Sequence, residues 1–263
     1  MSLVKTARDT TSIFWREMTR YRRQRIRLAI TVVQPVIWLG LLGSTMNEAT
    51  SRIPGVALVL GAKDYFDYMT PGVIVLTTLF GAIYAGMSVI WDRRLGFLAK
   101  MLASPIARSS IPLGKMLAAG AQNTIQALVV MAAARLFGVI FVTGVAGMLA
   151  ALLVAFFVSI LLSGISIALA ARIRSHEVLL AVVGFLTMPL IFTSTVMVPT
   201  TFMPGWLAEI TAWNPLTYAA APIRTLVSKG WFLKTIALDA ASVALVAVVA
   251  ALLAIRAFRR PAV

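Results

Sequence analysis

Long runs of uncharged, mostly apolar residues alternate with short charged segments along this chain. The runs cover residues 28–47, 68–91, 116–134, 136–171, 178–208 and 240–255, and the last extends back to 235 across Asp239. An α-helix needs about 20 residues to cross the hydrocarbon core of a bilayer. The run after Arg135 is longer than one span needs, and Gly138 and Gly144 predict a turn before the next helix. The pattern therefore predicts six spans, at residues 28–47, 68–91, 116–138, 145–171, 178–198 and 235–255.

The composition agrees with a helical membrane protein. Of the 263 residues, 60% are hydrophobic and 13% are charged, and the mean hydropathy is +0.92. Soluble proteins have roughly 45–50% apolar and about 25% charged residues, so we do not expect a water-soluble globule. The absence of cysteine excludes a disulfide framework, thiolate metal ligands and a cysteine nucleophile. We expect an all-α integral membrane protein with a single transmembrane domain over residues 1–263.

The positive charges lie mainly on one side of the predicted spans. Eighteen of the 24 Lys and Arg residues fall before residue 28, in 92–115, in 172–177 and after 255, and five fall in the connections on the other side. Since cytoplasmic loops carry the excess of Lys and Arg, we predict a multi-pass protein of the plasma (inner) membrane with both termini in the cytoplasm. This distribution also accounts for the net charge of +15 without nucleic acid as a partner.

Residues 6–27, before the first span, are predicted to form a helix on the cytoplasmic membrane surface. Phe14, Met18 and Tyr21 recur at helical spacing among arginines, and Trp15 lies beside them. A basic retention signal with a frayed helix is the alternative. A cleaved signal peptide is not expected, because the basic segment is long and no clear cleavage site of small residues follows the apolar run.

The connection at 92–115 carries a second amphipathic pattern. Leu95, Leu98 and Leu102 recur on one side of a short predicted helix, and Pro105 ends it because proline cannot continue the helical hydrogen bonds. An apolar face outside the bilayer needs a cover. The periodicity alone leaves two covers open, the groove of a partner protein and the membrane surface.

The segment 199–234 is predicted to form short re-entrant or interfacial helices on the external side. It is apolar but interrupted by prolines, and its tryptophans are typical of the headgroup level. These residues are Pro199, Pro204, Pro215, Trp206, Trp213 and Trp231. Asn214 followed by Pro215 predicts a capped helix start and a helix over about 215–228.

The sequence shows no reactive site. It has no phosphate-binding loop, since Gly114 and Lys115 lack the upstream glycine and the following Ser or Thr. The one histidine, His176, has no cluster of carboxylates near it in the sequence, so neither a metal site nor a catalytic triad is expected. Arg135 and Asp239 lie near the outer ends of their predicted spans, where we expect a structural role, a mutual ion pair or contact with headgroups. We therefore expect no catalytic residue, and no metal or cofactor bound by this chain.

Polar and aromatic side chains within the spans are the candidates for a substrate pathway. Gln34 and Trp38 share one face of the first span, and Thr77, Phe80 and Tyr84 share a face of the second. Prolines interrupt the first and fifth spans, which suits a wall that moves. The complete candidate set is Gln34, Pro35, Trp38, Thr77, Phe80, Tyr84, Pro189 and Phe192.

Two further patterns predict contacts between helices. Gln122, Asn123 and Gln126 in the third span are expected to hold helices together. The fourth span carries Gly147, Ala151, Ala155, Ser159 and Ser163 at four-residue intervals. Such a ladder lets another helix approach closely, and packing within the protomer is favoured over a dimer interface.

Four stretches resemble the type-2 ABC exporter permeases, and among these the daunorubicin/doxorubicin-resistance-like branch. They are QPVIWLGLLG at 34–43, YFDYMTPG at 65–72, GFLAKMLASPIARSSIPLGK at 96–115 and FMPGWLAEITAWNPLTYAAAPIRTL at 202–226. Their order, their spacing and their agreement with six spans make the combination specific. The resemblance covers most of the chain.

The resemblance implies a permease that dimerises, with a homodimer expected, and that couples to separate cytoplasmic ATPase subunits holding ATP and Mg²⁺. It implies that 6–27 is the family's connecting helix and that 92–115 contains its coupling helix. The residues that would contact the ATPase are Leu95, Gly96, Phe97, Leu98, Met101, Leu102, Pro105 and Arg108. The family commonly has acidic residues at the positions of Arg94 and Lys100, so the chain departs from the family pattern there.

The implied function is ATP-driven export of a hydrophobic or amphipathic substrate, a drug-like molecule or a lipid ahead of a glycan. The pathway would lie between the first, second and fifth spans of the two protomers. The alternatives are a self-sufficient membrane channel or carrier, a membrane-embedded lipid-modifying enzyme, and a membrane anchor for the partner. The sequence leaves the substrate's identity and the choice between homodimer and heterodimer open.

Overall fold

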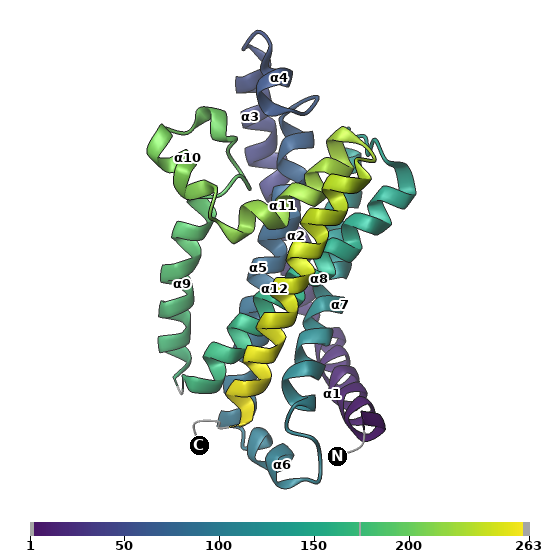
Figure 1. Ribbon diagram of the computed structural model, residues 1–263, viewed down its shortest axis with the longest axis vertical. Coiled ribbons are helices and arrows are strands. Elements are labelled where there is room, and N and C mark those ends of the chain that lie inside the picture. The colour runs from purple at the N-terminus through teal and green to yellow at the C-terminus, as the bar shows by residue number, and fades with distance from the viewer. Residues whose placement is uncertain (1–2, 174, 260–263) are drawn as a thin grey trace.

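The computed structural model describes residues 3–173 and 175–259, and every regular element within these residues is helical (Figure 1). The chain begins with α1 (Leu3–Arg23), α2 (Arg25–Ile37), the π-helical η1 (Trp38–Gly43), α3 (Ser44–Ser51) and α4 (Val56–Leu60). It continues with α5 (Tyr65–Arg94), α6 (Phe97–Ala103), α7 (Ser110–Leu136), α8 (Gly144–Arg172) and α9 (His176–Phe192). The remainder is the 3-10 turn η2 (Thr200–Phe202), α10 (Gly205–Thr211), α11 (Pro215–Arg224), the π-helical η3 (Thr225–Lys229) and α12 (Leu233–Arg259).

Long apolar helices run between two ends of the molecule, here named the α6 end and the α4 end. In the described residues, five helical stretches are long and apolar enough to cross a membrane, namely Leu28–Ser51, Val56–Arg94, Ser110–Leu136, Gly144–Arg172 and Leu233–Arg259. Five of the six predicted spans lie almost wholly within these stretches. The remaining predicted span, 178–198, corresponds to α9. This helix has 17 residues, which rise about 26 Å and fall slightly short of the roughly 30 Å hydrocarbon core.

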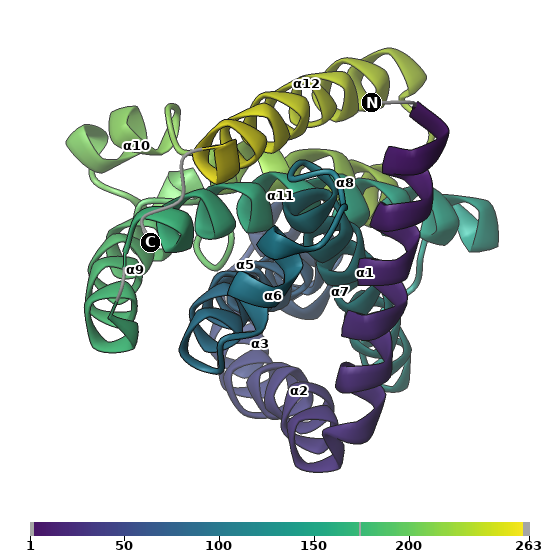
Figure 2. The same ribbon diagram turned by 90° about the horizontal axis from the view of Figure 1, so that it is seen from below.

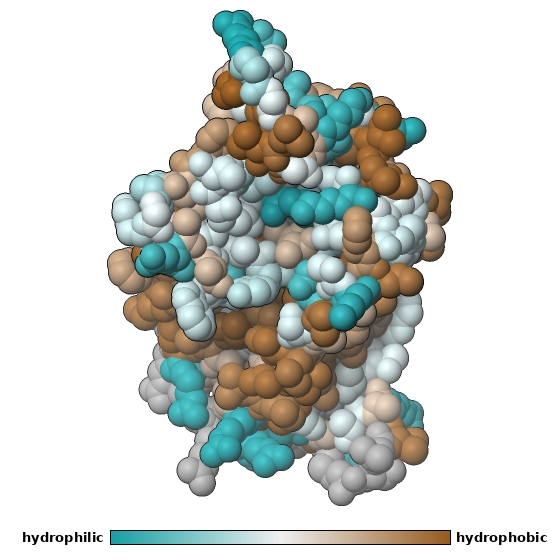
Figure 3. Space-filling view, turned by 45° about the horizontal axis from the view of Figure 1, so that its top comes forward, coloured by the Kyte–Doolittle hydropathy of each residue, from teal (hydrophilic) through white to brown (hydrophobic). Residues whose placement is uncertain are grey.

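The first helix and the end of the last helix lie on one side of the molecule. Figure 1 shows α1 and the last turns of α12 at the α6 end, and Figure 2 shows α1 along one flank of the bundle. In the space-filling view, apolar side chains fill much of the lower part of the visible face, between hydrophilic groups above and below them (Figure 3). An apolar band between two polar ends is the surface that a bilayer requires.

The first predicted span is an irregular helix. Pro35 lies inside α2 and has no N–H to donate, and the backbone passes into π-helix at Trp38. Gly43 closes the π-helical turn at a position where an added Cβ would lie 2.7 Å from the Phe66 ring. The QPVIWLGLLG stretch therefore forms an irregular helix held closely against α5.

The centre of the bundle is formed by α5, α7 and α8. Asn123 on α7 donates to the Thr78 carbonyl of α5 at 3.3 Å and to the Ser159 hydroxyl of α8 at 2.7 Å. Gly81 faces this amide, because an added Cβ would lie 1.8 Å from the amide oxygen. The small-residue ladder of α8 is buried along its whole length. This confirms the prediction that the ladder packs within the protomer.

The prediction that the fifth span extends to residue 198 is wrong, because α9 ends at Phe192. The residues after it form turns whose backbone oxygens bond to side chains of other helices. The carbonyl of Thr195 accepts from the Tyr68 hydroxyl at 2.8 Å and from the Arg224 guanidinium at 2.6 Å. The Asn214 amide donates to the Leu190 carbonyl at 2.8 Å. Irregular backbone is tolerated within apolar surroundings only where its polar groups are satisfied in this way.

The predicted helix start at Asn214 is confirmed. The Asn214 side-chain oxygen accepts from the Leu216 N–H at 2.8 Å, and Pro215 occupies the first turn. The helix runs through α11 and η3 to Lys229, close to the predicted end near 228.

The predicted surface helix at 6–27 is present as α1, but it ends at Arg23. One side of α1 packs on α7, where an added Cβ at Gly114 would lie 2.7 Å from the Ile13 side chain. Its other side exposes Trp15. The helix is therefore partly covered by protein and does not lie wholly free on a surface.

Candidate functional site

A groove lies between α2, α5 and α9, with a volume of about 860 Å³. Seven of the eight residues predicted for the substrate pathway line it, namely Gln34, Pro35, Trp38, Thr77, Phe80, Tyr84 and Phe192. The eighth, Pro189, does not line the groove, and α9 adds Met188 and Ile191. Ligand pockets in proteins measure roughly 300–1,000 Å³, so the groove has room for a small amphipathic molecule.

The groove is long and open on one side. Its lining on α5 extends from Val73 to Trp91, a rise of about 27 Å, which is comparable with the thickness of the hydrocarbon core. The side chains of Trp38 and Phe192 are 44% and 70% exposed. The groove therefore opens to the outside of the protomer along its length.

The chemistry of the lining changes from one end of the groove to the other. Towards the α6 end it consists of Arg23, Gln24, Arg25, Tyr84 and Trp91. Further along it is mainly apolar, with Thr31, Gln34, Thr77 and Gln126 as the polar members. No Asp or Glu lines the groove among the described residues.

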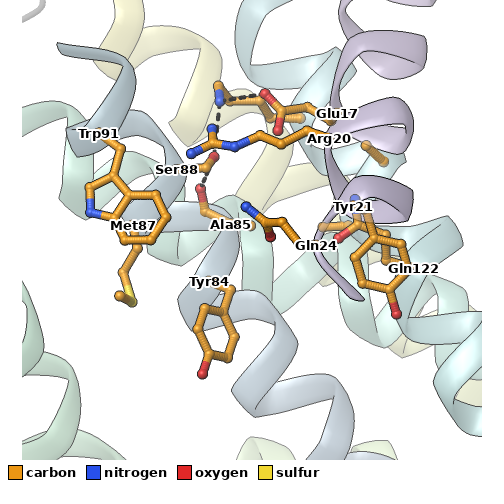
Figure 4. Close-up of a pocket in the computed structure, with 13 residues that line it drawn as sticks. Glu17, Arg20, Tyr21, Gln24, Tyr84, Ala85, Met87, Ser88, Trp91 and Gln122 are labelled. Atoms are coloured by element: carbon orange, nitrogen blue, oxygen red, sulfur yellow. Dashed lines mark hydrogen bonds and ion pairs between the residues drawn. The ribbon is translucent and has the colours of Figure 1, made fainter. Parts of the chain in front are cut away.

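A buried cluster of charges adjoins the groove where α1, α5 and α7 meet. Figure 4 shows Glu17 and Arg20 of α1, and Gln24 just after this helix, facing Tyr84, Ser88 and Trp91 of α5. The ammonium of Lys115 on α7 bonds to Glu17 at 2.8 Å, to Asp92 at 2.7 Å and to the Ser88 hydroxyl at 2.9 Å. These three acceptors match the three N–H donors of a lysine ammonium. The ion pairs therefore tie three helices together.

Arg16 extends this cluster to α6. Its guanidinium pairs with Glu17 and Asp92, lies 4.3 Å from the centre of the Phe97 ring, and approaches the sulfur of Met101 at 3.4 Å. A cation over an aromatic face is attracted by the ring quadrupole. A displacement of α6 would therefore act on α1 and α5 through one side chain.

Sequence reasoning did not identify this cluster. Glu17 lies in a basic segment and Asp92 lies among arginines at a helix end, where charges are usually solvated. The available signal was weak. Lys115 begins an uncharged run, and a buried lysine requires an acidic partner.

Protonation of Glu17, which lies outside the membrane-spanning helices, should affect the stability of the cluster. Burial raises the pKa of this carboxyl, but the ammonium of Lys115 and the guanidinium of Arg16 outweigh burial and hold the pKa below its usual value of 4.5. A carboxyl with a lowered pKa in the folded state stabilises the fold above its unfolded pKa, and the contribution is lost as the pH falls through the folded value. We expect the excess stability of wild type over Glu17→Gln to be complete at neutral pH and to shrink below about pH 4.5. Thermal unfolding of both proteins in detergent across this range measures it, and a pH-independent difference would contradict the linkage.

The residues predicted to contact an ATPase divide into exposed and buried groups. The prediction that Leu95, Leu98 and Leu102 share one helix side is wrong, because α6 begins only at Phe97. Gly96, with a φ of 68°, turns the chain sharply after α5, so the helical periodicity does not continue through it. Leu95 is 76% exposed, whereas Leu98 is 3% exposed and packs inside the protomer.

The exposed members form the outer side of residues 95–108, here named the α6 segment. Leu95, Phe97, Pro105 and Arg108 are exposed, Gly96 and Leu102 are half-buried, and Leu98 and Met101 are buried. The connection after α6 is fixed, since the Asp9 carboxylate accepts from the Ala107 N–H at 3.0 Å. The Arg108 guanidinium donates to the Arg259 carbonyl at 3.3 Å. The α6 segment is therefore a shaped surface and not a loose loop.

The isolated ionisable residues have local contacts. Arg135 donates to the Val139 carbonyl at 3.2 Å, and no ion pair with Asp239 is found in the described residues. His176 stacks on the Trp91 ring with the ring centres 6.0 Å apart. Within the part of the chain that the structure describes, no group of His, Asp or Glu side chains could hold a metal ion.

Comparisons with known proteins identify the family. The family model described as ABC-2 type transporter matches residues 8–227. The ycf38 transport permease of Cyanophora paradoxa is 34% identical over 211 residues, which cover 79% of this chain and 70% of that protein. The corresponding protein of Porphyra purpurea is 31% identical, over 78% of this chain and 69% of its own length. The daunorubicin resistance ABC transporter permease protein DrrB1 of Streptomyces coeruleorubidus is 25% identical, over 83% and 74% of the two chains.

Proposed function

Because the chain belongs to the ABC-2 type transporter family, we propose that it is the permease subunit of an ATP-driven exporter. The chain is a multi-pass membrane protein of the transport permease type. We also propose that a separate cytoplasmic ATPase, carrying ATP and Mg²⁺, docks on the exposed side of the α6 segment. The permease then moves a hydrophobic or amphipathic molecule out of the cytoplasm.

The observation that carries the proposal is the connection between the α6 segment and the wall of the groove. The outer side of this segment presents Leu95, while Phe97 and Met101 contact Arg16 of the charge cluster. Asp92, in the same cluster, lies on α5, and α5 also lines the groove. A push on α6 would therefore be transmitted to a wall of the groove.

The proposed transport cycle needs two packings of the same helices. We propose that α9 with the turns after it completes six spans, that the α6 end is cytoplasmic, and that the protein lies in the plasma (inner) membrane. Two copies of the permease would place their grooves face to face, so that the pathway runs between them. The ATPase would shift the balance between an inward-open and an outward-open packing.

The experiment that tests the proposal is purification of the solubilised chain from its native cells, with identification of the proteins that copurify. We expect an ABC ATPase with wild type and at least about a tenfold lower yield with Leu95→Asp/Pro105→Asp, because two buried carboxylates without partners disfavour an interface. Val4→Asp/Ala7→Asp adds the same charge to exposed positions of α1 and should retain the ATPase.

Two outcomes would contradict the proposal. Loss of the ATPase in the α1 control as well would remove α6 as the docking segment. Absence of any nucleotide-binding protein with folded wild type, together with substrate flux in liposomes that contain the chain alone, would favour a self-sufficient channel or carrier.

A further inference from the structure

We propose that the groove takes an anionic amphiphile, with its acyl chains between α2, α5 and α9 and its acidic headgroup at Arg23 and Arg25. The inference rests on the proposed function and names the substrate class for the same site. The groove would bind molecules with a phosphate or carboxylate headgroup more tightly than neutral and cationic amphiphiles of the same size.

The mouth of the groove is positively charged. Arg16 and Arg20 of α1 pair with Asp92. In the described residues neither Arg23 nor Arg25 makes such a pair, and both line the groove. Since no carboxylate lines the groove in the described residues, these two guanidinium groups set the sign of its potential. An anionic headgroup would supply their counter-charge.

Arg23 and Arg25 lie just before the first apolar stretch of the chain. Gln24 interrupts the helix between α1, which is amphipathic, and α2, which begins the first apolar stretch. Arg23 and Arg25 therefore flank the point where the chain enters the bilayer, at the level of lipid headgroups. A guanidinium binds phosphate or carboxylate through two parallel hydrogen bonds, which a neutral headgroup cannot replace.

The part of the groove beyond the arginines is long and mainly apolar. Beyond the arginines its lining includes Ile26, Ile30, Leu76, Phe80 and Ile191. The mainly apolar part of the α5 wall runs from Val73 to Gly81, a rise of about 12 Å, and Tyr84 and Trp91 follow at the arginine end. Extended acyl chains match a long apolar slot with one polar end. A compact cationic drug would meet two positive charges at the mouth and no carboxylate to balance its own charge.

The experiment uses quenching of tryptophan fluorescence by brominated lipids, since Trp38 and Trp91 both line the groove. The permease is reconstituted in phosphatidylcholine vesicles that contain increasing fractions of brominated phosphatidylglycerol or brominated phosphatidylcholine with identical chains. Quenching that is lost in Trp38→Phe is assigned to the groove. For wild type we expect half-maximal groove quenching at an at least about fivefold lower fraction of phosphatidylglycerol than of phosphatidylcholine.

Variants of the two arginines test the assignment. Arg23→Gln/Arg25→Gln should bring the ratio close to one. Arg8→Gln/Arg22→Gln removes the same charge from exposed positions of α1 outside the groove and should keep the wild-type ratio. Both double variants keep six of the eight basic residues before position 28, so the orientation signal remains. Arg23→Glu/Arg25→Glu should prefer a brominated cationic lipid that carries a trimethylammonium group and no phosphate, a gain that misfolding would not produce.

Several results would overturn the inference. Equal quenching of wild type by both lipids would remove the preference for an anion. Displacement of the lipid by millimolar glycerol phosphate would assign the arginines to a free phosphate compound. Absence of quenching by either lipid, with cross-linking of Trp38→Cys between two copies, would assign the groove to the second protomer. None of these measurements involves the ATPase, so they can fail while copurification succeeds, and the reverse.

Discussion

Replacing Lys115 with methionine should lower the stability of the chain by about 3–5 kcal/mol, because the carboxylates of Glu17 and Asp92 lose the buried ammonium and keep only the partly exposed guanidinium groups of Arg16 and Arg20. Lys115 is 2% exposed, and Glu17 and Asp92 are 7% and 4% exposed. The ammonium lies within 2.8 Å of one carboxylate and 2.7 Å of the other. Methionine nearly preserves the volume but satisfies neither charge. We expect a large drop in the midpoint of thermal unfolding in detergent, or loss of the folded protein.

Compensating and control variants separate lost charge pairing from lost packing. Glu17→Gln/Asp92→Asn/Lys115→Met removes the three buried charges and should recover most of the midpoint, since the charges that remain, on Arg16 and Arg20, are partly exposed and can be solvated. Arg94→Gln breaks the exposed ion pair with Glu177 and should leave the midpoint unchanged. A triple variant as unstable as Lys115→Met would show that the shape of the lysine, and not its charge, matters.

Replacing Gly72 with alanine should lower the stability by about 1–3 kcal/mol through overpacking. A Cβ at Gly72 would lie 1.8 Å from the carbonyl oxygen of Val196. This backbone cannot retreat easily, because hydrogen bonds from Tyr65 and Tyr68 hold the carbonyls of Met197 and Thr195 on either side. We expect a lower midpoint of thermal unfolding and a looser connection after α9.

Gly184→Ala is the matched control on α9. No atom lies within 4 Å of the added Cβ, and alanine in a helix interior is favoured over glycine by about 0.5–1 kcal/mol. The same chemical change should therefore be neutral or slightly stabilising at this position. If both variants melted alike, the close approach of α5 to the turn after α9 would be refuted.

The membrane-embedded helices were predictable because each one depends on nearby residues. An apolar run of about 20 residues identifies a span without knowledge of its neighbours. The helix start at Asn214 and the turn at Gly138 and Gly144 likewise follow from local backbone chemistry. Seven of the eight pathway candidates line one groove because shared helix faces follow from helical periodicity.

Local patterns failed where distant residues alter the backbone or bury a face. The fifth span ends early at Phe192 because Asn214, Tyr68 and Arg224 satisfy the turns after it. The apolar side of the α6 segment was misassigned because Gly96 turns the chain and the protomer itself covers Leu98.

The amino-acid pattern alone determined the fold class, the approximate spans and the family, since apolar runs and short motifs are read over a few residues at a time. The charge cluster and the basic residues at the mouth of the groove emerged only from the packed helices. Lys115 and Glu17 are separated by 98 positions, and Tyr68 and Thr195 by 127. A buried charge is stable only beside its partner, and a sequence does not show which of its many charges will become neighbours when the helices pack.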